Sequence, residues 1–246
     1  MLRVKVLFSL LAASCLLAAS SFADTTFTDS TFNLANYSGT ATYESDPSIG
    51  VVHDQCSSCG NPAGPTNTAL QLEFTLPNGG VTVFALVNST FTYNPGTQGA
   101  IVSIDASVDK DITLSVPANP GNVFGNAFRP VIEQDGTFYL AGIAGPNFTG
   151  GTTGYVTFPP TGLVASDFVS FDFATGAFGS ANPNFAGDPM LFGLAQGISF
   201  ADAINVEADY DNLSFVVHTP EPSTLLLMGL GLAGLAVVSR RRPRFD

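Results

Sequence analysis

The sequence contains no tryptophan, only three cysteines and only eight basic residues among 246. Four of these basic residues fall within the last seven positions and two within the first five. Between the two ends, Lys110 and Arg129 stand against 18 carboxylates. Because a surface with this charge repels phosphate backbones, we exclude nucleic acid as a partner.

Motifs of common enzyme classes are also missing. The chain has no Gly-x-Ser-x-Gly nucleophile elbow and no phosphate-cradling loop with a lysine. A Cys–His nucleophile would need Cys56 or Cys59 unpaired. With 18 carboxylates, some pair with glycosidase spacing will always be found, so that argument is uninformative. We therefore expect that the protein is not an enzyme.

The N-terminus has the pattern of a secretory signal peptide. Arg3 and Lys5 precede an apolar run over residues 6–19, and Ser21-Phe22-Ala23 puts small residues at the two positions that signal peptidase reads. The sequence therefore predicts a signal peptide over 1–23, which signal peptidase removes.

A second apolar run lies near the C-terminus, with basic residues behind it. Residues 225–238 form 14 consecutive apolar positions, which as a helix rise about 21 Å against a hydrocarbon core of about 30 Å. Basic residues held on the cytoplasmic side fix orientation and stop transfer. We expect a short transmembrane segment over about 223–239. A buried core helix fits less well, because the run is apolar on every side and ends in charge.

This C-terminus has three parts in a recognisable order: Pro220-Glu221-Pro222, then an apolar segment with three glycines, then Arg240, Arg241 and Arg242. The order closely resembles the PEP-CTERM sorting signal of Gram-negative bacteria, over about a tenth of the chain. The resemblance implies recognition by a membrane-embedded exosortase and removal of the tail near Pro222. It also implies an inner-membrane-anchored intermediate, followed by attachment or release at the cell surface or in extracellular polysaccharide.

The body between the two ends shows the period of strands and no convincing amphipathic helix. Leu70, Leu72, Phe74 and Leu76 alternate with polar residues, as in a half-buried strand. Asp135-Gly136 predicts a tight hairpin, and the loops are rich in Gly, Pro, Asn and Ser. Further alternation occurs over 87–94, 112–116, 169–173 and 213–217. These features predict an all-β fold, a jelly-roll-like antiparallel β-sandwich, over residues 24–218, followed by a sorting signal over 219–246.

The cysteines Cys56 and Cys59 allow three interpretations. We favour a local disulfide, because the exported body then holds an even pair of cysteines in an oxidising compartment. A thioredoxin-like redox pair needs a helix N-terminus, whereas the Gly-Asn-Pro that follows indicates a loop. His53 would supply a third zinc ligand, but a fourth is not evident nearby. Cys15 leaves with the signal peptide, and its lipidation is a less favoured alternative.

Two acidic clusters raise the question of a cation. Alternate positions of an extended segment point their carboxylates the same way, and calcium takes several oxygen ligands at once. Residues 93–109, 131–142 and 207–217 weakly resemble concanavalin-like and carbohydrate-module-like jelly rolls, in which an aspartate opening the final strand often belongs to a structural calcium site. Asp209 and Asp211 are therefore the candidate ligands and calcium the candidate cofactor. We favour the alternative that the acidic residues solvate the surface. The clusters are Asp105, Asp109 and Asp111, and Glu207, Asp209 and Asp211.

We expect an exported surface or extracellular-matrix protein with a structural or adhesive role. Its partners would be signal peptidase, exosortase, the membrane before processing, and extracellular polysaccharide. A carbohydrate-binding module is the alternative, weakened by the absence of tryptophan for stacking on sugars. A concave face with exposed tyrosines would favour that module, and a deep cleft with paired carboxylates would favour a secreted hydrolase, the third interpretation. The tyrosines are Tyr37, Tyr43, Tyr93, Tyr139, Tyr155 and Tyr210.

Overall fold

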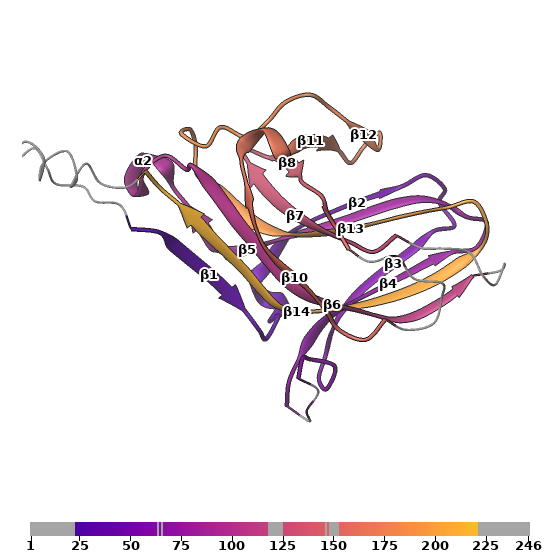
Figure 1. Cartoon of the computed structure of the whole chain (residues 1–246). Helices are drawn as coiled ribbons and strands as arrows, with labels where there is room; N and C mark the ends of the chain where they lie inside the picture. The colour runs from indigo at the N-terminus through magenta and orange to yellow at the C-terminus, as the bar shows by residue number, and fades with distance from the viewer. Residues whose placement is uncertain are drawn as a thin grey trace, which may run out of the picture. The chain divides into compact units, whose positions relative to one another are not determined.

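Two antiparallel sheets face each other and enclose the core (Figure 1). This computed structural model describes residues 23–62, 64, 66–117, 125–145, 147 and 153–220. Within them, Asp24–His218 form one compact unit. The expected antiparallel β-sandwich is therefore confirmed.

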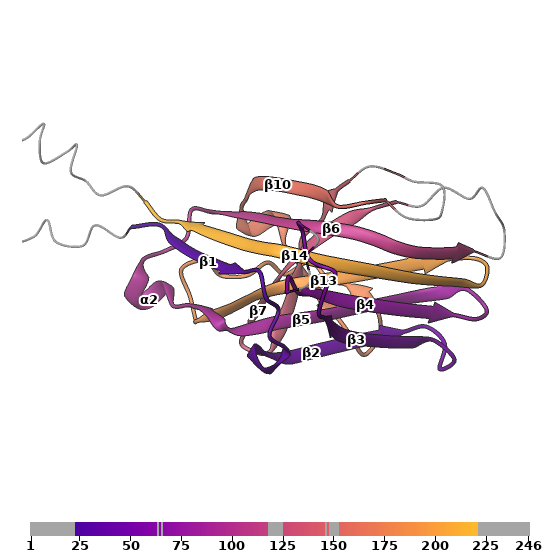
Figure 2. The ribbon, with the colours of Figure 1, turned by 90° about the horizontal axis from the view of Figure 1, so that it is seen from below.

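Sheet A has the strand order β10-β6-β14-β4-β3, and β1 also pairs with β14. Figure 2 shows β6, β14, β4 and β3 lying side by side. The edge strand β10 carries Pro159 and Pro160, where its register against β6 shifts. The strands are β1 (Thr25–Asp29), β3 (Gly50–Cys56), β4 (Ala69–Leu76), β6 (Ser103–Pro117), β10 (Val156–Leu163) and β14 (Ile204–His218).

Sheet B has the order β12-β11-β8-β7-β13-β5-β2, with β9 paired to β7. Its strands are β2 (Tyr37–Glu44), β5 (Gly80–Tyr93), β7 (Ala127–Gln134), β8 (Thr137–Leu140), β9 (Ile143–Ala144), β11 (Val169–Asp172), β12 (Ala177–Phe178) and β13 (Met190–Phe200). Short helical turns connect some strands: η1 (Leu34–Asn36), α2 (Pro95–Gln98) and η2 (Ala165–Asp167).

The alternating residues of β4 and of the end of β14 lie where the sequence predicts. Leu70, Leu72, Phe74 and Leu76 of β4 are buried in the core between the sheets. Residues 213, 215 and 217 of β14 are fully buried as well. The expected hairpin joins β7 to β8, with Asp135 at φ 53° and Gly136 at φ 73°, the positive angles that a two-residue hairpin turn requires.

The prediction of one continuous alternation over 87–94 is wrong. Phe192 of β13 is opposite Asn88, but the preceding Leu191 is opposite Thr92, so β5 bulges between them. The bulge exchanges the two faces of the strand: Val87 lies on the outer face of sheet B, whereas Phe91 lies in the main core. Neighbouring residues of β13 are opposite Asn88 and Thr92, so β5 has three extra residues here. An odd number of extra residues reverses the side-chain period beyond them, and the sequence pattern does not reveal that exchange.

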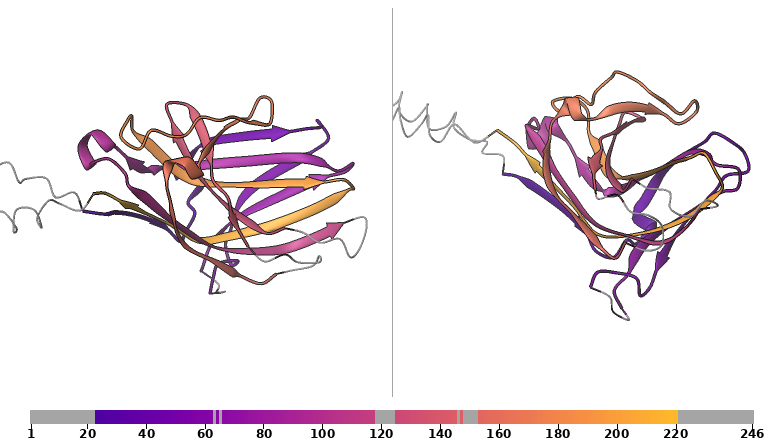
Figure 3. Two further views of the ribbon diagram at one scale, coloured as in Figure 1. Left: turned by 45° about the horizontal axis from the view of Figure 1, so that its top comes forward. Right: turned by 45° about the vertical axis from the view of Figure 1, so that its right-hand side comes forward.

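Sheet B curls, so that its two ends meet around a second, smaller apolar cluster. Tyr43 of β2 contacts the edge of the Phe171 ring of β11, with 6.4 Å between ring centres. Gly176, at φ 70° in the turn after β11, lies so close to Tyr43 that a Cβ there would overlap its ring. Figure 3 shows this curl from two further directions. The buried members of the cluster are Val83, Ala85, Val87, Val131, Leu140, Phe171 and Ala195.

Lys110 is a basic side chain buried between the two sheets, with no exposed surface. Its Nζ donates to the carbonyl of Ala127 at 2.8 Å and to Oε1 of Gln196 at 2.6 Å. It also lies 5.2 Å from the centre of the Tyr210 ring. Burial, aided by the charge of Arg129, lowers the pKa of Lys110 to about 7. The charged form is therefore disfavoured by folding.

This burial predicts a pH-dependent stability. Between about pH 7 and the ordinary lysine pKa of 10.5, the unfolded chain binds a proton at Lys110 that the native protein does not, so stability rises with pH. Lys110→Met should reduce the slope of unfolding free energy against pH by the equivalent of one proton. Urea unfolding between about pH 7 and pH 9 measures this slope. Asp46→Asn is the control and should keep the slope, because this exposed carboxylate has a pKa below its ordinary 3.8 and does not titrate in this range. A wild-type slope in Lys110→Met would contradict the assignment.

Candidate functional site

Five carboxylates gather on the outer face of sheet A, on its two longest strands. The register places Asp209 opposite Asp111 and Asp211 opposite Asp109, and Glu207 precedes them on β14. Like charges directly opposite each other on a sheet are destabilising. The structure thus brings together most of both predicted acidic clusters. Asp105 does not join them, because its carboxylate contacts His218 at 3.0 Å.

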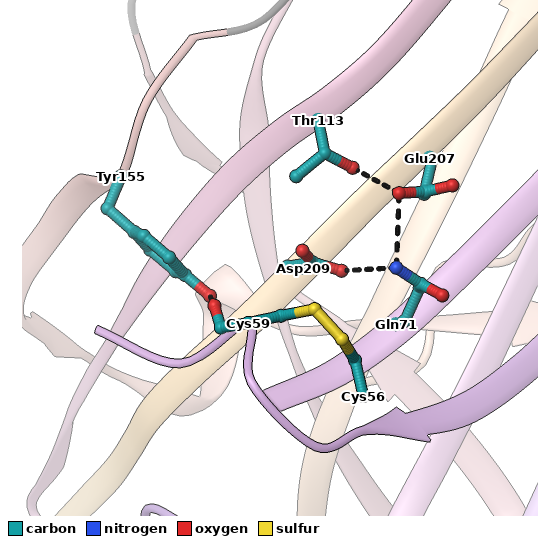
Figure 4. Close-up of a disulfide and its surroundings, with 7 residues drawn as sticks. All are labelled: Cys56, Cys59, Gln71, Thr113, Tyr155, Glu207 and Asp209. Carbon is teal, nitrogen blue, oxygen red and sulfur yellow. Dashed lines mark hydrogen bonds between the residues drawn. A yellow bond between two sulfur atoms is a disulfide. The ribbon is translucent and has the colours of Figure 1, made fainter. Parts of the chain in front are cut away.

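Neutral donors from neighbouring strands hold these carboxylates (Figure 4). Gln71 Nε2 donates to Glu207 Oε1 and to Asp209 Oδ1, both at 3.1 Å. Thr113 Oγ1 donates to Glu207 Oε1 at 2.6 Å. Thr153 and Thr157 donate in the same way to Asp111 and Asp109. Neutral amide and hydroxyl groups therefore stabilise these carboxylates by hydrogen bonds. They take the place that a lysine or arginine side chain has in an ion pair.

The segment after β3 is fastened to this face by a disulfide and by asparagines. Cys56 and Cys59 form the disulfide, which confirms that prediction. Tyr155 donates its hydroxyl hydrogen to the carbonyl of Cys59. Beyond the disulfide, the backbone N–H of Asn61 donates to Asp211 at 2.6 Å and its side chain to Asp109 at 2.9 Å. The carboxylates thus anchor the loop that follows the disulfide.

The disulfide decides against the zinc interpretation. Both thiols that would bind zinc are joined to each other. The third proposed ligand, His53, stacks near the Phe84 ring, with 5.0 Å between ring centres. In the part of the chain that the structure describes, no helix starts at the cysteines, as a thioredoxin-like pair would need.

Burial changes the acidity of this face. Asp209 is 2% exposed, and burial is the main cause that raises its pKa to about 6, with Glu207 and Asp111 adding to the effect. Burial raises the pKa of Asp211 and of the Tyr155 hydroxyl as well. Among the described residues, no group of three or more His, Cys, Asp or Glu side chains is arranged to hold a metal ion. Calcium at Asp209 and Asp211 stays a prediction.

A second feature is an aromatic hollow of about 510 Å³ on sheet B, where that sheet curls. Phenylalanines dominate its lining, and Phe178 is 52% exposed. None of the six tyrosines lines it, and Tyr37, Tyr93 and Tyr210 are buried. Sequence reasoning missed this site, because the curl brings together strands whose phenylalanines read as ordinary core residues. They are Phe138, Phe171, Phe173 and Phe178.

The predicted sorting residues fall mostly beyond the described part of the chain. Pro220 is exposed and is the last described residue. Glu221, Pro222, Arg240, Arg241 and Arg242 lie outside the described residues, as do the predicted transmembrane segment and residues 1–22 of the signal peptide. Among the residues that are described, we find no helix with the length and apolar character needed to cross a membrane.

Comparison with known proteins identifies the C-terminus. Residues 218–242 match the PEP-CTERM protein-sorting motif, as the sequence resemblance indicated. The chain therefore carries this sorting motif from His218, the last residue of β14, onward. No curated protein matches the chain.

Solved structures with a similar arrangement include carbohydrate-binding modules and lectins. A family 11 carbohydrate-binding module of a cellulosomal cellulase of Clostridium thermocellum is 12% identical, with a TM-score of 0.40, covering 82% of this chain and 99% of that one. A family 30 module from the same organism is 10% identical, with a TM-score of 0.37 and coverages of 77% and 96%. Basic winged bean lectin is 10% identical, with a TM-score of 0.34 and coverages of 80% and 100%. At these scores the likeness carries no argument about function.

The acidic face predicts a stability that falls as pH rises. Because the native pKa of Asp209 is about 6 against an ordinary 3.8, the native protein binds the extra proton between these values. The stability from that proton is fully present below about pH 4 and is lost as pH rises through 6. Asp209→Asn should therefore raise the unfolding free energy at pH 7 by about 3 kcal/mol and change it little near pH 4. Denaturant unfolding at the two pH values measures both.

Asp172→Asn is the matched control. Asp172 is fully exposed, and hydrogen bonds from Thr175 and Ala174 lower its pKa, so its replacement should not stabilise the protein at pH 7. Equal effects of the two substitutions would contradict the account. Thermal unfolding with and without added calcium tests the metal site. A rise in Tm with calcium that Asp209→Asn and Asp211→Asn abolish would assign calcium to these residues.

Proposed function

We propose that the protein is an exosortase substrate, exported to the cell surface or extracellular matrix, where its β-sandwich has a structural or adhesive role. The observation that carries this proposal is the match of residues 218–242 to the PEP-CTERM sorting motif, which begins at the last residue of β14. The body would be residues 24–218, released from a signal peptide over 1–23 and from a sorting signal over 219–246. The compact unit Asp24–His218 has the same bounds as this body.

The chemistry of the body supports a structural role. The clustered carboxylates of sheet A accept hydrogen bonds from Asn, Gln and Thr side chains, and so hold a loop in place. A disulfide closes that loop next to them. A strongly acidic surface favours solubility outside the cell. These features suit a protein that persists in an oxidising, crowded environment.

The membrane argument comes from length and charge. A 14-residue apolar run is short for a permanent span, whereas basic residues behind it keep its end cytoplasmic. Such a segment suits a temporary anchor that presents Pro220-Glu221-Pro222 to a membrane enzyme. The arginines would hold the substrate, and the Pro-Glu-Pro segment would be the part that exosortase recognises.

Two sets of substitutions test this division of roles. Replacing Arg240, Arg241, Arg242 and Arg244 with Ser should let the tail slip through the membrane and spoil sorting. Glu221→Ala should leave insertion intact and block tail removal. Mass spectrometry of the C-terminal peptide, in a host with exosortase and in the same host without it, measures both. Recovery of the intact C-terminal peptide from mature wild-type protein in the exosortase host would contradict the proposal.

The aromatic hollow favours a second candidate function, binding of a glycan. The exposed ring of Phe178 offers a surface against which a sugar ring can pack, and Ser170 and Thr137 add polar groups at the lining. The net negative charge of the body favours a neutral glycan over an acidic one. The hollow does not favour a hydrolase, because Asp172 is the one carboxylate among the described residues that line it, whereas glycoside hydrolysis uses a facing pair.

A glycan array tests this second candidate. The isolated body should bind a neutral glycan, and Phe178→Ala should weaken that binding at least tenfold, because it removes the most exposed ring of the hollow. Val52→Ala is the control, since Val52 is comparably exposed, at 49%, on β3 of the other sheet. Unchanged binding in Phe178→Ala would place the glycan elsewhere.

A further inference from the structure

The imidazole of His218, the last residue of the compact unit, contacts the carboxylates of Asp24, the first residue of the unit, and of Asp105. Nδ1 of His218 lies 2.8 Å from Oδ2 of Asp24, and its Nε2 lies 3.0 Å from Oδ2 of Asp105. We call these three residues the His218 clasp. The two carboxylates raise the pKa of His218. The three side chains are between 31% and 50% exposed, so the clasp is held weakly compared with a buried ion pair.

The backbone around the clasp belongs to three segments. His218 is opposite Ser103 of β6, and Val217 is opposite Thr25 of β1. The N–H of Val102 donates to the carbonyl of His218 at 2.8 Å. Figure 2 shows β1 and β14 leading to the same end of the sandwich. Thr219 is 8% exposed and Val217 is fully buried, so an opening of the strand end moves Thr219 and His218 together and becomes costly at Val217.

The clasp lies very close in sequence to the sorting motif. The motif match begins at His218 itself, and Pro222 follows four residues later. Four extended residues reach at most about 14 Å, whereas a body of this length has a radius of gyration of about 16 Å. An enzyme embedded in the membrane must therefore grip the chain near Pro222 with the folded sandwich almost in contact.

We propose that the His218 clasp is a latch that holds the end of β14 in the sheet and thereby slows tail removal. This inference rests on the proposed function, processing by exosortase. When the clasp opens, His218 and the buried Thr219 leave the end of the sheet together. The chain between the sandwich and Pro222 then becomes longer and can leave the sandwich in more directions. Because the clasp is partly exposed and at a strand end, small changes in it alter the open population several-fold.

Processing kinetics of the full chain test the latch. In a host with exosortase, His218→Ala should speed the loss of the C-terminal tail about two- to fivefold in a pulse–chase experiment, the range expected for partly exposed ion pairs. Asp105→Asn should have a smaller effect, because Asp24 still holds His218. Asp46→Asn is the control: this exposed carboxylate binds Ser48 within its own turn, and its loss should leave the rate unchanged.

A spacer separates the latch from a general loss of stability. Insertion of about six Gly and Ser residues between His218 and Thr219 adds about 20 Å of reach, so the spacer alone should speed processing. In that background His218→Ala should have no further effect. An equal acceleration with and without the spacer would overturn the latch, and so would an unchanged rate in His218→Ala when the wild type is processed. A wild type that keeps its tail would instead remove the proposed function itself.

Discussion

The pairing of β6 with β14 is the interaction on which the rest of the body depends. These strands bury Tyr210 and Lys110 on one face and set aspartate opposite aspartate on the other. Burial of the inner face stabilises the pairing, whereas repulsion across the outer face opposes it. The loop after the disulfide, Gln71 and the surrounding threonines reduce that repulsion, because each donates a hydrogen bond from an uncharged group to a carboxylate oxygen. The acidic face is thus a built part of the sheet as well as a solvated surface.

The same pair of strands places a buried titratable group on each face of one sheet. Lys110 lies inside with a depressed pKa, and Asp209 lies on the outer face with a raised pKa. In both cases burial favours the neutral form. The two groups are adjacent in the register, since Asp209 is opposite Asp111 and Tyr210 is opposite Lys110. Their contributions to stability have opposite pH dependence, and the most favourable conditions for one are the least favourable for the other.

Much of the fold follows from the sequence, and the sites follow less completely. The alternation in β4 and the Asp135-Gly136 turn are local patterns, so they predicted buried residues and a hairpin correctly. The Cys56–Cys59 disulfide was predicted because the exported body holds an even number of cysteines and would lie in an oxidising compartment. The bulge in β5 and the curl that gathers Phe138 and Phe178 depend on pairing between distant segments, which no local period records. For the same reason the acidic clusters could be recognised, whereas their asparagine and glutamine partners could not.

The proline pair in β10 bears on how copies of this protein behave when they are crowded together. An edge strand with unpaired backbone groups is a template for a strand from another molecule. At this edge, Pro159 and Pro160 remove two N–H donors where the register shifts. The opposite edge, β3, runs into the disulfide at Cys56, and β12 at the end of sheet B is two residues long. At these three edges, therefore, a strand from another copy finds few backbone groups with which to pair.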